Sequence, residues 1–92
     1  MNKQVLLLKE ESFKQARKDV TSSNYREEIK KFSEEELLED LKFWKELYNN
    51  YLDKAKNKDA PLTTLKNYIF KKRYYYYKLY FVECEILRRC SQ

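Results

Sequence analysis

LTTLKNYIFKKRYYYYKLYFVECEILRR, residues 62–89, contains neither glycine nor proline. Such an unbroken segment predicts a single helix of about 28 residues, roughly 42 Å long at 1.5 Å per residue. Pro61 stands directly before it, where proline suits the first turn of a helix. The whole chain has no glycine and one proline, so turns and bulges that need glycine are disfavoured. We therefore expect helices joined by short links.

At about 100° per residue, the 62–89 helix divides into three strips. An apolar stripe, which predicts core contact, consists of Leu62, Leu65, Ile69, Tyr76, Tyr80 and Leu87. A narrow polar strip lies almost opposite and is expected in solvent; it consists of Asn67, Lys71, Lys78, Glu85 and Arg89. Between them lies an aromatic flank formed by Phe70, Tyr74, Tyr77 and Phe81. Because a helix with one neighbour needs an apolar arc of little more than about 100°, this helix must contact at least two elements.

The aromatic flank has two interpretations. In the first it is core, with the N-terminal helix packed on the flank and the preceding long helix on the apolar stripe. In the second it contacts a partner, since aromatic side chains beside cations are enriched in binding hot spots. The second interpretation predicts a partner-binding surface made of Phe70, Lys71, Tyr74, Tyr77, Lys78, Phe81 and Arg89.

Upstream of this helix, the segment Phe32–Leu37 is the clearest helix start. Ser33 and Glu36 have the spacing of a capping box, and Phe32 and Leu37 have that of a hydrophobic staple. The helix that begins there is expected to run over about 34–56, because apolar residues recur with a 3.5-residue period.

Two further helices are expected nearer the N-terminus. Asn24 followed by Glu27 suits the start of a short helix over about 25–31. Leu6, Phe13 and Val20 recur every seven residues and predict an amphipathic helix over about 3–20. The sequence thus predicts an all-α fold: residues 1–92 as a single domain, a small antiparallel bundle of three to four helices with a long C-terminal helix.

The residue types that most chemistry requires are missing. The chain has no histidine, the commonest metal ligand and neutral-pH acid–base group, and no glycine for a phosphate-binding loop. Cys84 and Cys90 are about 240° apart on a helix, so they cannot pair with each other or share a zinc ion. We therefore expect no enzyme, no cofactor and no metal.

Composition also bears on location and origin. The sequence contains no apolar run long enough to cross a membrane and none that forms a signal peptide, which predicts a cytoplasmic protein. Its bias toward Lys, Asn, Tyr, Ile and Phe is typical of an AT-rich genome. We expect a phage, viral or other mobile-element source, and the host cytoplasm as location if it is viral.

The functional expectation follows from charge and from the 62–89 helix. Twenty Lys and Arg against 15 Asp and Glu give a net charge of +5, which favours acidic partners. The leading hypothesis is a small non-enzymatic inhibitor or adaptor that binds another protein, one with an acidic surface, through the aromatic and basic residues of that helix. The alternative is a nucleic-acid-binding protein using the basic strip. A further alternative is a structural homo-oligomer, with a homodimer as its simplest form.

Overall fold

The computed structural model describes residues 3–22, 24–57 and 59–91, with side chains for 9–21, 24–57 and 59–91, and it is all-α over them. The four α-helices are α1 (Lys3–Ser22), α2 (Tyr25–Glu28), α3 (Glu34–Lys54) and α4 (Leu62–Cys90). A short 3₁₀ helix, η1 (Ile29–Lys31), follows α2 directly. The all-α prediction is confirmed. The ends of α1, α3 and α4 lie within two residues of their expected positions, whereas the short helix expected over 25–31 is divided into α2 and η1.

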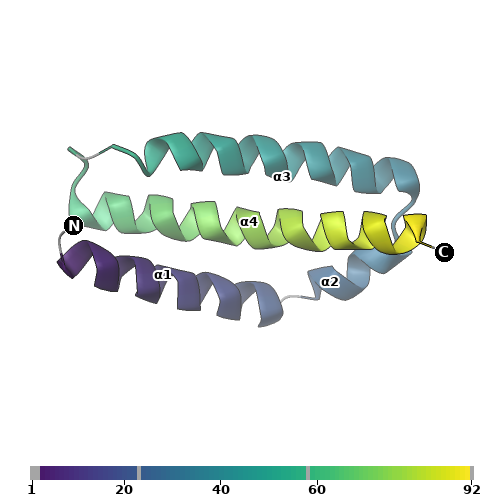
Figure 1. The fold of residues 1–92 in the computed structure, drawn as a ribbon, viewed down its shortest axis with the longest axis horizontal. Helices are drawn as coiled ribbons and strands as arrows, with labels where there is room; N and C mark the ends of the chain where they lie inside the picture. Colours follow the sequence, from purple (N-terminus) through teal and green to yellow (C-terminus); the bar gives the residue numbers. More distant parts are fainter. Residues whose placement is uncertain (1–2, 23, 58, 92) are drawn as a thin grey trace.

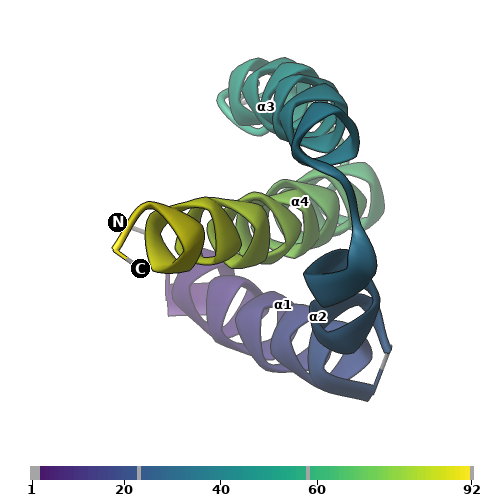
Figure 2. The same ribbon diagram turned by 90° about the vertical axis from the view of Figure 1, so that its right-hand side faces the viewer.

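Helix α4 lies in the middle of the molecule (Figure 1), with α3 on one side and α1 followed by α2 on the other. The long helices alternate in direction along the chain, so α4 runs antiparallel to α3 and parallel to α1. Both α1 and α3 pack mainly on α4 and make little contact with each other, as the end-on view in Figure 2 shows. The result is an elongated body of 46 × 22 × 19 Å.

The predicted capping box opens α3. The Glu36 N–H donates to Ser33 Oγ at 3.1 Å, and the Ser33 N–H donates to Glu36 Oε1 at 3.0 Å. The hydrogen bond from the Ser33 N–H is the main cause that lowers the pKa of the Glu36 carboxyl. Phe32 packs against the core cluster that contains Leu37, the arrangement expected of the staple. The start of α3 is therefore fixed by local sequence.

Two other helix starts differ in detail from the prediction. Asn24 precedes α2, but its backbone carbonyl, not its side chain, accepts the hydrogen bonds from Glu27 and Glu28. Pro61 lies just outside α4, and its carbonyl accepts from the Leu65 N–H at 2.8 Å. Proline there leaves no N–H unsatisfied, so it serves the start of α4 equally well.

The principal core lies where α2 and η1 meet the start of α3 and the C-terminal half of α4. It consists of buried Tyr25, Ile29, Leu37 and Val82, with Phe32, Leu41, Trp44, Phe81 and Ile86 packed around them. On α1, Ala16 and Val20 are buried and Phe13 is half-buried; Leu6 lies outside the described side chains.

The expected orientation of α4 is wrong for its C-terminal half. Tyr76, Tyr80 and Leu87 of the predicted apolar stripe are exposed there, as is Leu62 at the other end of the helix, and only Ile69 of that stripe is buried. Conversely, Lys78 and Glu85 of the predicted solvent strip are each only 6% exposed. The cause is the α2–η1 segment, which packs on the charged side of α4 and leaves the opposite side uncovered.

Candidate functional site

Lys78 is held inward by aromatic rings from three helices. Its Nζ lies 4.1 Å from the ring centroid of Tyr25, 5.3 Å from that of Tyr74 and 5.7 Å from that of Trp44. Such cation–π contacts are favourable, and here they offset part of the free energy lost by taking the ammonium out of water. Burial lowers the pKa of Lys78, and the nearby carboxylates of Glu28 and Asp40 oppose that shift. Lys78 is therefore a structural residue of the interior.

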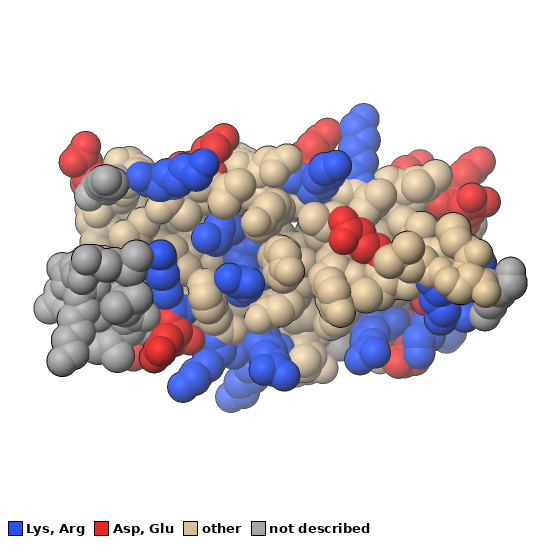
Figure 3. Space-filling model, in the orientation of Figure 1, with Lys and Arg blue, Asp and Glu red and all other residues tan. Residues whose placement is uncertain are grey.

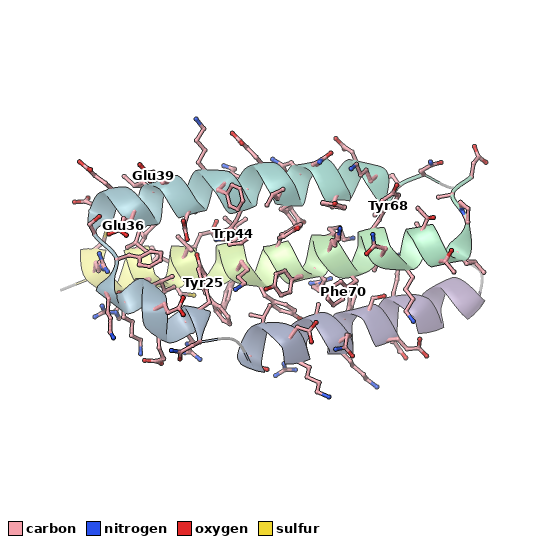
Figure 4. The ribbon with its side chains drawn as sticks, turned by 180° about the vertical axis from the view of Figure 1, so that it is seen from behind. Tyr25, Glu36, Glu39, Trp44, Tyr68 and Phe70 are labelled. Carbon is pink, nitrogen blue, oxygen red and sulfur yellow. The ribbon has the colours of Figure 1, made fainter. Side chains whose placement is uncertain are left out.

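The rings around Lys78 are themselves fixed by hydrogen bonds. Tyr25 OH donates to Asp40 Oδ2 at 2.6 Å and accepts from Trp44 Nε1 at 2.8 Å, which joins α2 to α3 (Figure 4). Burial and the Asp40 carboxylate raise the pKa of Tyr25, so this phenol stays protonated. The polar atoms thus satisfy one another.

Glu85 and Arg89 form the second inward charge group. Glu85 accepts hydrogen bonds from Arg88 and from Arg89, and the Arg88 bond is the larger cause of its pKa falling from 4.5 to about 2. Arg89 also donates to the carbonyl oxygens of Ile29, Lys30 and Phe32 at 3.3, 3.2 and 2.7 Å. Its guanidinium is thereby engaged with the η1 segment.

The remaining residues of the predicted surface also contact their own chain. Phe70 and Tyr74 stack with ring centroids 6.0 Å apart, and Tyr77 is half-buried against Tyr76. Phe81 packs on the core, with the Arg26 guanidinium 5.8 Å from its ring.

Lys71 donates to Tyr51 OH at 3.4 Å. It lies at one end of a row of rings that runs between α3 and α4, through Tyr51, Tyr75 and Trp44. Tyr68 contacts Tyr51 and so extends this row toward the start of α4. Phe70, which stacks on Tyr74, is labelled with Tyr68 in Figure 4. The structure thus places the seven predicted residues on more than one side of α4. Four of them contact other elements of the chain: Lys71, Lys78, Phe81 and Arg89.

The uncovered side of α4 is a different set of residues, which we call the open face: exposed Tyr76, Tyr80, Glu83 and Leu87, with half-buried Arg73 at one end. Tyr76 is 39%, Tyr80 51% and Leu87 65% exposed. These positions lie about 180° around α4 from Lys78 and Glu85. In Figure 3 the α4 row is mainly uncharged, with a few basic and acidic groups set among the uncharged atoms, and several Lys and Arg side chains lie along the α1 edge.

Neighbouring helices border the open face. Tyr76 lies against Tyr48 of α3, with ring centroids 5.9 Å apart. The Arg73 guanidinium lies 3.9 Å from the ring centroid of Phe13 in α1 and 5.1 Å from that of Tyr76. Between Tyr80, Phe81 and the end of α1 is a shallow groove of about 470 Å³. The surface can therefore accept a side chain or a helix, but it does not enclose a small molecule.

Hydrophobicity alone missed the open face, because it placed Tyr76, Tyr80 and Leu87 in the core. Glu85 is three residues from Arg88 and four from Arg89, a spacing that lets the side chains pair along one helix but does not indicate burial.

Comparisons with known proteins identify no family for this chain. No family model matches the sequence, and no curated protein and no solved structure is similar enough to count as a match. Over residues 3–22, 24–57 and 59–91, no cluster of three or more His, Cys, Asp or Glu could hold a metal ion. Within the same ranges, no helix has both the length and the apolar character required to cross a bilayer.

Proposed function

We propose that this chain is a non-catalytic protein-binding domain whose contact surface is the open face of α4. The observation that carries the proposal is the exposure of Tyr76, Tyr80 and Leu87 in one helical row. Removing apolar surface from water favours association by roughly 25 cal/mol per Å² of buried area, before the entropy lost on binding is subtracted. Contiguous exposed patches of this type mark interaction sites on soluble domains.

The proposed surface differs from the one that the sequence suggested. Lys78 and Arg89 serve the interior, and Phe81 serves the core, so their removal would damage the fold before it affected a partner. By contrast, Tyr80 and Leu87 have half or more of their surface free. Tyrosine is well suited to such contacts because it combines a large ring with few rotatable bonds.

A catalytic role has little support from the ionisable groups. Lys78 is surrounded by rings, and Glu85 is occupied by two arginines. Glu85 borders a groove of about 440 Å³ with Lys30, Cys84 and Arg88, but both of its carboxylate oxygens accept hydrogen bonds from arginines. We therefore infer that the domain binds a partner without catalysing a reaction.

The nucleic-acid alternative has less support than protein binding. Single-strand binders stack bases on exposed rings beside free cations. Here Lys71 and Lys78 lie over rings of the same chain, so neither ammonium is free to contact a phosphate. Binding to single-stranded DNA or RNA across a salt series tests the alternative, because phosphate contacts weaken steeply as salt rises.

The direct test is capture of partners from an extract of the source cell, with immobilised wild type and two open-face variants, Tyr80→Glu and Leu87→Glu. Leu62→Glu is the matched control, because Leu62 is 51% exposed but lies at the opposite end of α4. We expect a nuclease-resistant protein partner that wild type and the control retain and both open-face variants lose. Equal capture by all four folded proteins would overturn the proposal.

A further inference from the structure

The open face has the residue spacing of a helix–helix seam. Arg73, Tyr76, Tyr80, Glu83 and Leu87 follow one another at alternating steps of three and four residues. This 3.5-residue repeat lets two helices stay in contact over several turns. From Arg73 to Leu87 the seam is about 21 Å long at 1.5 Å per residue.

Two charges in this seam have no counter-ion. Among the ion pairs of the described residues, none includes Arg73 and none includes Glu83. The Nε of Arg73 is buried without a hydrogen-bond partner. The two residues cannot pair with each other within one chain, because ten helical residues separate them by about 15 Å.

We propose that the partner of the open face is the open face of a second copy of this chain, packed antiparallel. The proposal rests on the protein-binding function above and specifies its partner. In an antiparallel pair, a step toward the N-terminus of one helix corresponds to a step toward the C-terminus of the other. If Tyr76 lies opposite Tyr80 of the second copy, the residue three positions before Tyr76 lies opposite the residue three positions after Tyr80. Arg73 then lies opposite Glu83 of the second copy, and the two-fold symmetry forms the same pair a second time.

The charges select this orientation. A parallel pair would place Arg73 beside Arg73 and Glu83 beside Glu83, and like charges at a seam are destabilising. The antiparallel pair neutralises all four charges and covers Tyr76 and Tyr80 of both copies. Because a seam of four helical turns is small for a specific interface, the dimer forms reversibly and its population rises with concentration.

Sedimentation equilibrium of the full chain over a range of concentrations tests the proposal with two single variants, Arg73→Glu and Glu83→Arg. Either change places like charges opposite each other twice, so each variant alone is expected to be monomeric. Mixed at equal amounts, the two variants restore both opposite-charge pairs, so a heterodimer is expected. The double variant R73E/E83R is expected to dimerise like wild type, since its charges are exchanged in both copies.

Lys14→Glu and Glu46→Arg are the controls, because they make the same charge changes at exposed positions of α1 and α3. They should dimerise like wild type. If Arg73→Glu does not fold, Glu83→Arg and Tyr80→Arg, both at exposed positions, must still abolish the dimer. A wild type that is monomeric at every concentration, or a mixture without heterodimer, would overturn the antiparallel dimer. The protein-binding function would survive that result if capture of another protein still required Tyr80 and Leu87.

Discussion

Arg89, near the end of α4, donates a 2.7 Å hydrogen bond to the carbonyl oxygen of Phe32, 57 residues earlier in the chain. Helices commonly end with a glycine in the left-handed conformation, which allows the last carbonyls to be satisfied locally. This chain has no glycine, and no described residue has a positive φ. The carbonyls at the end of η1 are satisfied by a distant side chain instead, and this contact helps to hold the α2–η1 segment on α4.

Replacing Arg89 with methionine should therefore lower the free energy of unfolding by about 2 kcal/mol, because carbonyls and the Glu85 carboxylate lose a charged donor. Arg88→Met is the matched control: Arg88 also pairs with Glu85, but its side chain is 49% exposed. Arg88→Met should lower the free energy of unfolding by less than about 1 kcal/mol. Urea denaturation measures both, and equal losses would show that the η1 carbonyls do not depend on Arg89.

Acid should destabilise the fold through Glu85. Its pKa is about 2 in the folded protein against an ordinary 4.5, so the unfolded chain binds its proton more readily. The stabilisation is therefore fully present above about pH 4.5 and is lost as the pH falls toward 2. Urea unfolding between pH 6 and pH 2 should show a steeper decline for wild type than for Glu85→Gln. Glu83→Gln, at an exposed position, should decline like wild type. Parallel curves for wild type and Glu85→Gln would contradict this role.

Lys78 should make the stability of the fold depend on pH in the alkaline range. Because burial lowers its pKa below 10.5, the unfolded chain holds this proton more tightly than the folded protein. Stability due to this group therefore rises with pH, from its lowered folded pKa up to about 10.5. Lys78→Met should remove that rise and change stability at pH 7 by less than about 1.5 kcal/mol, since volume is conserved.

Lys78→Ala provides the comparison, because it leaves a cavity among the rings and should cost more than the methionine variant. Unfolding curves at pH 7 and pH 9.5 measure both effects. A methionine variant that loses as much stability as the alanine variant would mean that the ammonium itself, and not its carbon chain, holds the rings in place.

Local sequence was sufficient to predict the helices. Ser33 and Glu36 fix the start of α3 by contacts only three residues apart, and Pro61 marks the start of α4. The orientation of α4 depends on contacts that local sequence does not encode. Lys78 is buried because Tyr25 and Trp44 surround it, and Arg89 is turned inward because η1 offers carbonyls. Tyrosine lines both sides of α4, so hydrophobicity could not determine which side is covered.

The open face follows from that orientation and is the basis of the proposed function. Tyr80 and Phe81 are adjacent in sequence, yet the structure places them in opposite environments. Tyr80 is 51% exposed, whereas Phe81 packs on the core cluster. The two positions therefore form a matched pair within a single turn of α4.

The most direct measurement is the free energy of unfolding of Tyr80→Ala and of Phe81→Ala, at a concentration where the chain is monomeric. We predict a loss of about 3 kcal/mol for Phe81→Ala, since it leaves a cavity beside the core. Tyr80→Ala should lose no more than about 0.5 kcal/mol, because its ring contacts mainly solvent. A loss for Tyr80→Ala as large as that for Phe81→Ala would mean that Tyr80 is core, and the open face would not exist.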